Sequence, residues 1–278
     1  MFDRGLNNLA WLEALTQKSS IITDGLNGKF DPADSASYNG SGTTWTNLIT
    51  GDDDGGDLYL GNSIAHTGTP RYFLFDGSDD FVGNVASTGY SDAVEYNLDP
   101  SDPNFTISFW FYSKSAYPLS NQTSQLFSLG SVDTRDIGTL RYGLAMTLSE
   151  TNKLTLWTVN EDGEPESVER EATDAIGRSI WNHITVVKEQ ATSTLRIYVN
   201  GKYQHMSNTN ETKGNTDLYG TSYEEEPIQF GRTKIDSDNY DYTPMWDRIG
   251  MILMYNTRAL KKSEIMSNFL SERSDYGY

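Results

Sequence analysis

Carboxylates are the most numerous groups in this chain that could do chemistry, since the sequence holds 39 Asp and Glu residues and no cysteine. Retaining glycoside hydrolysis needs two carboxylates about 5–5.5 Å apart in one cleft. The run 161–164 (Glu-Asp-Gly-Glu) has the wrong spacing and a central glycine, and the run 224–226 (Glu-Glu-Glu) precedes Pro227 in a predicted loop. We expect both to be solvated surface and predict that the chain is not an enzyme.

The other catalytic residue types are scattered. The histidines His66, His183 and His205 form no His/Glu pair at helical spacing, and the chain contains no Gly-x-Ser-x-Gly elbow. His183 lies in a predicted hairpin, where a hydrogen-bonded core side chain is the expected role. Trp45 follows a segment rich in glycine and serine and is expected to plug an edge of the fold.

Two acidic clusters are simple candidates for cation binding. The run 52–57 lacks the alternating spacing and the closing Glu of an EF-hand, so a solvated loop is expected. Asp76, Asp79 and Asp80 lie in a predicted tight turn, where carboxylates commonly accept backbone N–H bonds. Turn stabilisation is therefore their expected role.

An aromatic cluster near the C-terminal third of the chain suggests glycan binding. An exposed ring stacks on the apolar face of a sugar, while neighbouring amides and carboxylates hold the sugar hydroxyls. The residues that combine these features are Tyr219, Tyr223, Tyr240, Tyr242 and Trp246. The alternative is that several of these rings pack the end of the fold or a contact between subunits.

The overall charge limits the partners. At pH 7 the formal net charge of the 278 residues is −18. Such a surface repels phosphate, so nucleic acid and anionic membranes are not expected partners, whereas cations and neutral glycans remain open. The N-terminal sequence shows no secretory signal pattern, and no stretch approaches the length of a membrane span.

Hydrophobic periodicity predicts an all-β chain with a short N-terminal helix. Apolar residues on one face predict an N-terminal helical arm, and the residues expected to dock it on its own sandwich or on a partner are Leu6, Leu9, Trp11 and Leu15. Alternating or continuous apolar runs predict strands at 26–31, 71–82 (two strands), 105–112, 124–129, 141–148, 153–159, 228–231 and 249–255. Regular spacing without intervening helices selects an antiparallel two-sheet β-sandwich of jelly-roll type.

The clearest local signal is the segment 181–202, WNHITVVKEQATSTLRIYVNGK. Ile184 and Val186, and later Ile197 and Val199, alternate with more polar neighbours, as half-buried antiparallel strands do. A turn is predicted at 189–194, and Asn200-Gly201 marks a second reversal. Residues 105–112, apolar at nearly every position, predict a central strand covered on both faces.

These motifs resemble those of laminin-G-like and pentraxin-like lectin domains of the concanavalin A-like class. The resemblance rests on the Trp-x-His opening at 181, the Tyr-Val-Asn-Gly-Lys close at 198, and the segments 75–81, 227–232 and 249–269. It implies a helical arm over 1–24, one jelly-roll domain over 25–272 with a C-terminal helix, and a tail over 273–278. Lys261 replaces the usual Ser or Thr cap that would pair with Glu264, so we expect a less well fixed helix start.

Two details narrow the resemblance. The segment 38–45, which precedes Asn47-Leu48, and the ending with Asn268-Phe269 and 276–278 look like versions of this domain in structural proteins of tailed bacteriophages, especially marine ones. A laminarinase-type glycosidase of the same class would carry a Glu-x-Asp-x-x-Glu strand, which is missing from the sequence.

Pentraxins also imply a calcium site between two loops. The corresponding loops here are 131–136 and 233–241, and their candidate ligands are Asp133, Asp136, Asp236, Asp238 and Asp241. The pentraxin Glu-Gln-Asp ligand run is replaced by Thr233-Lys234-Ile235, which places a cation among the expected ligands. A solvated acidic loop is the alternative.

Together these features predict a structural and adhesive protein of a tailed-phage particle, such as a capsid decoration or a tail-fibre component, located in the virion. Its expected partners are other virion proteins, copies of itself and host glycans. The alternatives are a calcium-dependent lectin on a bacterial surface and, least favoured, a glycoside hydrolase.

Overall fold

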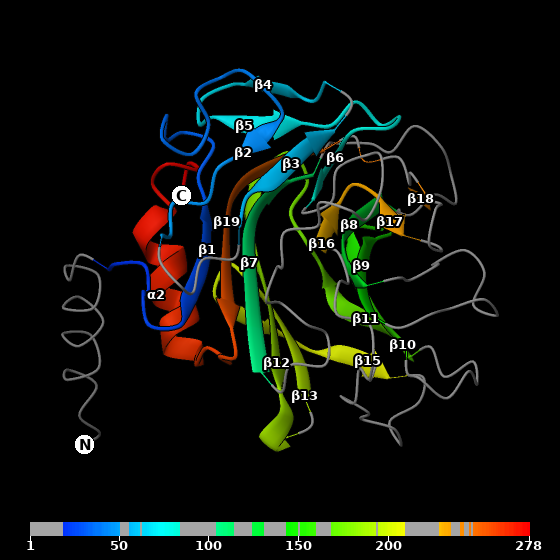
Figure 1. The fold of residues 1–278 in the computed structure, drawn as a ribbon. Helices are drawn as coiled ribbons and strands as arrows, with labels where there is room; N and C mark the ends of the chain where they lie inside the picture. Colours follow the sequence, from blue (N-terminus) through cyan, green and yellow to red (C-terminus); the bar gives the residue numbers. More distant parts are fainter. Residues whose placement is uncertain are drawn as a thin grey trace.

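The protein is described by a computed structural model in which two antiparallel sheets pack face to face (Figure 1). The described residues are 19–50, 56–61, 63–83, 104–113, 124–130, 143–149, 151–159, 168–192, 194–208, 228–234, 240–241, 245 and 247–278. The predicted fold class, an antiparallel jelly-roll sandwich, is confirmed. Within the described ranges, no helix has the length and apolar character that a membrane crossing requires.

The first sheet, sheet A, has eight strands in the order β14-β13-β12-β7-β19-β5-β4, with β1 also pairing with β19. Its strands are β1 (Leu26–Phe30), β4 (Ala65–Thr67), β5 (Tyr72–Leu74), β7 (Asn104–Tyr112), β12 (Trp181–Glu189), β13 (Thr194–Val199), β14 (Lys202–Gln204) and β19 (Arg248–Asn256). Helix α2 (Lys262–Glu272) covers the side of sheet A that faces away from the second sheet (Figure 1).

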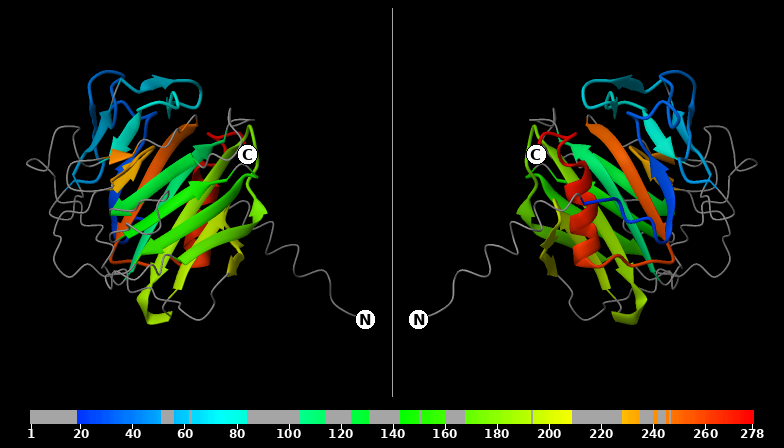
Figure 2. Two further views of the ribbon diagram at one scale, coloured as in Figure 1. Left: turned by 90° about the vertical axis from the view of Figure 1, so that its right-hand side faces the viewer. Right: turned by 90° about the vertical axis from the view of Figure 1, so that its left-hand side faces the viewer.

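The second sheet, sheet B, has nine strands in the order β15-β11-β10-β9-β8-β16-β6-β3-β2. Its strands are β2 (Thr44–Trp45), β3 (Leu58–Gly61), β6 (Phe81–Gly83), β8 (Ser124–Gly130), β9 (Gly143–Leu148), β10 (Lys153–Val159), β11 (Val168–Ala175), β15 (Met206–Asn208) and β16 (Ile228–Phe230). A small separate sheet pairs β17 (Thr233–Lys234) with β18 (Tyr240–Asp241). Side views show the layers and the helix outside them (Figure 2).

The core between the sheets is formed largely by aromatic and branched side chains. Phe109 of β7 meets Phe127 of β8 and Phe230 of β16, with ring centroids 5.9 Å and 5.5 Å apart in edge-to-face geometry. Trp45 is fully buried against Phe30 and Phe73 at the β2 end of sheet B, which agrees with its predicted role as an edge plug.

The predicted hairpin is confirmed. Strands β12 and β13 pair from Ile184↔Val199 to Glu189↔Thr194, and a short 3-10 turn (Gln190–Thr192) joins them. Asn200 and Gly201 have φ values of 52° and 73°, the left-handed pair that a tight two-residue hairpin turn requires before β14.

The predicted half-burial of this hairpin is wrong for β12. Every residue from Trp181 to Lys188 is buried, including the polar Asn182 and Thr185. The reason is the third layer: α2 and the residues after it cover the outer face of sheet A. A strand with two covered faces needs no polar side.

His183 lies in this outer layer, and its role differs from the prediction. Its ring contacts Trp110 and Phe269, with centroids 5.2 Å and 6.0 Å apart, and its Nδ1 has no hydrogen-bond partner among the described residues. The hydrogen bonds run instead through its backbone, which pairs with Asn200. Burial lowers the pKa of His183 to about 3, so the imidazole is neutral.

Trp110, on the outer face of β7, organises the third layer. The ring of Tyr276 stacks on its indole at 4.2 Å, and Phe269 of α2 lies 5.8 Å away. The indole N–H donates a 2.7 Å hydrogen bond to Oε2 of Glu272, which is 4% exposed. Burial raises the pKa of the Glu272 carboxyl to about 7.

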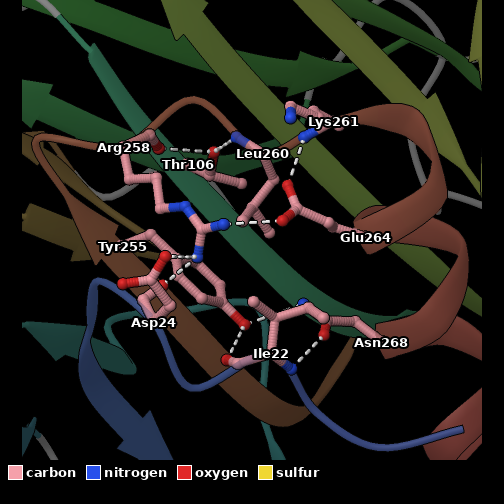
Figure 3. A network of polar contacts seen from close by, with 9 residues as sticks. All are labelled: Ile22, Asp24, Thr106, Tyr255, Arg258, Leu260, Lys261, Glu264 and Asn268. Carbon is pink, nitrogen blue, oxygen red and sulfur yellow. Dashed lines mark hydrogen bonds and ion pairs between the residues drawn. The ribbon is translucent and has the colours of Figure 1, made fainter.

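A polar network connects α2 to β7 and to the segment before β1 (Figure 3). The Arg258 guanidinium lies 2.6 Å from Oε1 of Glu264 and 3.1 Å from Oδ2 of Asp24. Oε2 of Glu264 accepts the backbone N–H of Lys261 at 2.8 Å. The start of α2 is therefore held by Glu264 and Arg258, which corrects the expectation of a less well fixed helix start.

The same network holds residues 19–24, which were predicted to belong to the arm. The N–H of Ile22 donates to Oδ1 of Asn268, the Nδ2 of Asn268 donates to the Tyr255 hydroxyl, and that hydroxyl donates to the carbonyl of Ile22 (Figure 3). This closed ring of hydrogen bonds fastens the chain to α2 before β1 begins. Residues 1–18 lie outside the described residues.

The two strands predicted within 71–82 are both present but lie in different sheets, since β5 belongs to sheet A and β6 to sheet B. Strand β11, with the sequence VEREATDA, was not predicted, since its composition lacks the apolar alternation of a strand.

The burial of Glu272 predicts a pH-dependent stability. Its pKa is about 7 in the folded protein against an ordinary value of 4.5, so the folded state keeps a proton that the unfolded chain releases. The stabilising term is complete below about pH 4.5 and is lost as the pH rises to about 7. Glu272→Gln keeps an acceptor for Trp110 and should gain stability over the wild type across this interval.

Chemical denaturation from pH 4 to pH 8 measures the effect. Asp174→Asn, which removes an exposed carboxylate from β11, is the control. If the difference between Glu272→Gln and wild type stays constant with pH, Glu272 does not titrate as described.

Candidate functional site

A shallow pocket of about 200 Å³ opens between the loop after β1 and the β4–β5 hairpin. The loop supplies one wall and the hairpin supplies the other. The lining residues are Pro32, Ala33, Ser35, Tyr38, Asn39, Gly40, His66 and Arg71. The lining combines an apolar corner, aromatic rings and polar groups.

His66 ties the two walls together. It lies on β4 directly opposite Phe73, and its Nε2 is 2.8 Å from the carbonyl of Pro32. Because a carbonyl only accepts, Nε2 carries the proton in this contact. The Tyr38 ring meets the imidazole edge to face at 4.9 Å.

The loop wall is held by its own hydrogen bonds. Ser37 Oγ donates to the carbonyl of Thr46 at 2.7 Å, and the Tyr38 hydroxyl donates to the carbonyl of Gly42 at 3.0 Å. Oδ1 of Asn39 accepts from the backbone N–H of Ser41, again at 3.0 Å. The amide nitrogen of Asn39, on an exposed residue, keeps its donors for another partner.

Arg71 supplies the cationic group of the pocket. It immediately precedes β5 and is exposed. Within the described part of the chain, no carboxylate lies at ion-pair distance from its guanidinium. The pocket thus offers guanidinium, amide and hydroxyl groups beside an apolar corner of Pro32 and Ala33, an arrangement that can hold the hydroxyls and the ring of a sugar.

The acidic cluster Asp76, Asp79 and Asp80 is a turn, as predicted. Its carboxylate oxygens lie within 4.8 Å of one another. Oδ2 of Asp80 accepts the N–H of Asp76, and Oδ1 of Asp76 accepts the N–H of Ser78, both at 2.8 Å. Burial raises the pKa of Asp80 to about 6. The carboxylates of Asp76 and Asp80 are thus occupied by the turn itself.

The predicted calcium ligands lie mostly outside the described residues. Asp133, Asp136, Asp236 and Asp238 are in this group, whereas the backbone of Asp241 pairs with Thr233 in the β17–β18 hairpin. Strand β17 contacts β8, the strand that leads into the first acidic loop. The calcium site therefore stays a prediction.

The predicted glycan-binding and assembly residues are likewise outside the described residues. This applies to Tyr219, Tyr223, Tyr242 and Trp246 of the aromatic cluster and to Leu6, Leu9, Trp11 and Leu15 of the arm. Only the backbone of Tyr240 is described, in β18 opposite Lys234. Their roles stay predictions.

With the geometry described, the chain can be compared with known proteins. A sequence profile described as "Concanavalin A-like lectin/glucanases superfamily", of laminin G type, matches residues 83–265. The chain belongs to this superfamily. The family resemblance predicted from the hairpin and its neighbouring motifs is confirmed. Among curated proteins, no sequence matches the chain.

Solved structures show the same fold in larger proteins. This chain aligns with Trypanosoma rangeli sialidase at a TM-score of 0.59 and 15% identity. The alignment covers 99% of this chain and 40% of the sialidase. The chain aligns with the botulinum neurotoxin serotype D binding domain at 0.54 and 14%, covering 89% of this chain and 52% of that chain. The chain thus spans about half or less of the structures it matches.

The prediction that the chain is not an enzyme is contradicted by this comparison. Sialidases are glycoside hydrolases, and several of the aligned structures are Trypanosoma rangeli sialidases, at 14–16% identity. The missing carboxylate motif therefore does not exclude enzymes from the relatives of this sandwich. At such identity the likeness shows the fold alone.

Sequence reasoning did not identify the pocket. Residues 38–45 were noted as a turn segment, and His66 was noted only as one of three scattered histidines. One usable signal was present: His66 and Arg71 flank the Gly68-Thr69-Pro70 turn, so the two ends of a short hairpin bring them near each other.

The predicted calcium site can be tested by melting. An ion that binds the folded state stabilises it by mass action, by about 2.7 kcal/mol at a hundredfold excess over its dissociation constant. If the 131–136 and 233–241 loops hold calcium, the melting temperature should be higher in calcium than in EDTA, and Asp236→Asn with Asp238→Asn should remove the difference. Equal melting temperatures in calcium and EDTA would exclude a structural calcium site.

Proposed function

We propose that this superfamily member is a carbohydrate-binding protein that uses the pocket between the β1–β2 loop and the β4–β5 hairpin. The observation that supports the proposal is the pocket lining on a lectin-like sandwich: rings, amide, hydroxyl and guanidinium around an apolar corner. Sugars need this pairing, because one face of the ring is apolar and its edge carries hydroxyls.

The rigidity of the walls favours selective binding. His66 is fixed by the carbonyl of Pro32, and Tyr38 by the carbonyl of Gly42 and by Phe73 at 5.1 Å. Walls that are ordered before binding lose little conformational entropy when a ligand enters. The affinity of the pocket for a sugar is therefore higher than that of flexible walls with the same contacts would be.

We further propose that the protein serves as a structural and adhesive component of a tailed-phage particle, with host glycans and other virion proteins as its partners. The support is the sequence of 38–45 and of the C-terminal segment, which look like phage versions of the domain. The first of these segments also forms a wall of the pocket, through Tyr38, Asn39 and Gly40. A lectin on a bacterial surface is the alternative setting.

Blocking the pocket tests carbohydrate binding. Ala33 is exposed and lines the pocket, so Ala33→Leu should fill part of its volume without disturbing the core. The variant should weaken glycan binding by about tenfold or more, which corresponds to the loss of about 1.4 kcal/mol. The measurement is a glycan array followed by titration calorimetry on the best glycan.

Ala191→Leu is the matched control, since Ala191 is exposed on the turn between β12 and β13 and is not a pocket residue. It should bind as the wild type does. Equal binding by Ala33→Leu and wild type would show that the glycan binds outside this pocket. An array on which no glycan is bound would refute the proposal of carbohydrate binding.

The phage role has its own test. Removing residues 1–18 deletes Leu6, Leu9, Trp11 and Leu15 but keeps Ser20, whose carbonyl accepts a 2.9 Å hydrogen bond from Ser267. The truncated protein should fold with an unchanged circular dichroism spectrum and fail to sediment with particles, because apolar arms need a docking partner. Full incorporation of the truncated form would exclude the arm as the docking element.

A further inference from the structure

We propose that the pocket is selective for acidic glycans, with Arg71 holding the carboxylate or the sulfate group of the sugar. This inference rests on the proposed glycan binding and adds the chemical class of the ligand. The geometry points to an anion for three reasons. They are the charges around the pocket, the donors that line it and the hydrogen bonds that occupy the neighbouring carboxylates.

The charge around the pocket is unusual for this chain. The sequence has 39 acidic residues and a net charge of −18, yet the pocket lining contains Arg71 and no Asp or Glu. A lining without acidic residues leaves the cationic charge available to a ligand.

Three other arginines of the described residues are already engaged. Arg196 pairs with Glu189 at 2.7 Å, and Arg258 pairs with Glu264 at 2.6 Å. The Arg248 guanidinium lies over the rings of Tyr112 and Tyr72, 4.2 Å and 4.7 Å from their centroids. Arg71 differs, since the described chain gives it neither a carboxylate nor an aromatic ring.

The pocket is also rich in donors. Arg71 contributes five N–H groups in a planar fork, which matches two oxygens of a carboxylate or a sulfate. Asn39 on the opposite wall contributes its amide nitrogen, because its Oδ1 already accepts hydrogen bonds from Ser41. Donors on both walls favour a ligand group that accepts hydrogen bonds.

The nearest acidic residues in sequence are directed to their own turn. Oδ1 of Asp31 accepts the N–H of Ala33, and Oδ1 of Asp34 accepts the N–H of Ala36, both at 2.9 Å. Neither lines the pocket. Burial also raises the pKa of Asp31.

The test compares matched oligosaccharides on the full chain. One backbone is used in three forms: neutral, with a uronate in place of one neutral sugar, and with one sulfate ester. We expect an acidic form to bind at least about tenfold tighter than the neutral form, as charge-assisted hydrogen bonds to arginine predict. Arg71→Gln should remove that preference, and Arg71→Lys should keep part of it.

Lys202→Gln is the control for charge alone, since Lys202 is exposed on β14 and the variant changes the net charge by the same amount. It should keep the full preference for the acidic form. Tighter binding of only the uronate form or only the sulfated form assigns the anion to a carboxylate or to a sulfate, and either result supports the inference.

Failure of this inference is distinguishable from failure of the proposed function. If neutral and acidic forms bind equally, and Ala33→Leu still weakens binding, the pocket binds glycans and Arg71 does not select anions. If Arg71→Gln and Lys202→Gln reduce acidic binding equally, the preference comes from overall charge, and the inference is overturned. If none of the forms binds, the proposed glycan binding is itself refuted.

Discussion

Burial of both faces of β7 is the constraint on which the rest of the structure depends. The inner face presents Phe109 to the core between the sheets, and the outer face presents Trp110 to α2 and the C-terminal residues. A strand whose two faces are apolar cannot remain at the surface, so a third layer must cover sheet A. The polar network around Arg258 and the chain segment before β1 follow from that need, because they attach the covering helix.

The parts of the fold that could be predicted are those coded by local patterns. The 181–202 hairpin is set by its own turn residues, and β7 by its continuous apolar run. The complete burial of β12 could not be read from the hairpin, because its cover comes from residues after 260. The same holds for the pocket: Asn39, His66 and Arg71 carry no shared pattern, and only the docking of a loop on a hairpin brings them together.

The sandwich itself does not determine activity. Trypanosoma rangeli sialidase and a botulinum neurotoxin binding domain share this fold with the chain at 14–16% identity. The strands supply a rigid frame, and the chemistry lies in side chains on the loops and short hairpins at its edge. In this protein the described edge includes the β1–β2 loop and the β4–β5 hairpin. They are held against each other by the hydrogen bond between His66 and Pro32 and by the Tyr38 ring, which meets His66 and Phe73.

The pairing of the first described strand with the last has a mechanical consequence. Leu26 at the start of β1 lies opposite Tyr255 near the end of β19, so a tension applied to the two ends of the chain would pull on the same end of this antiparallel pair. In that geometry, strands peel apart one hydrogen bond after another instead of resisting together. The contacts of Asp24 with Arg258 and of Ile22 with Asn268 lie ahead of the first β1 bond. These two contacts would therefore have to break before the hydrogen bonds between β1 and β19 are pulled.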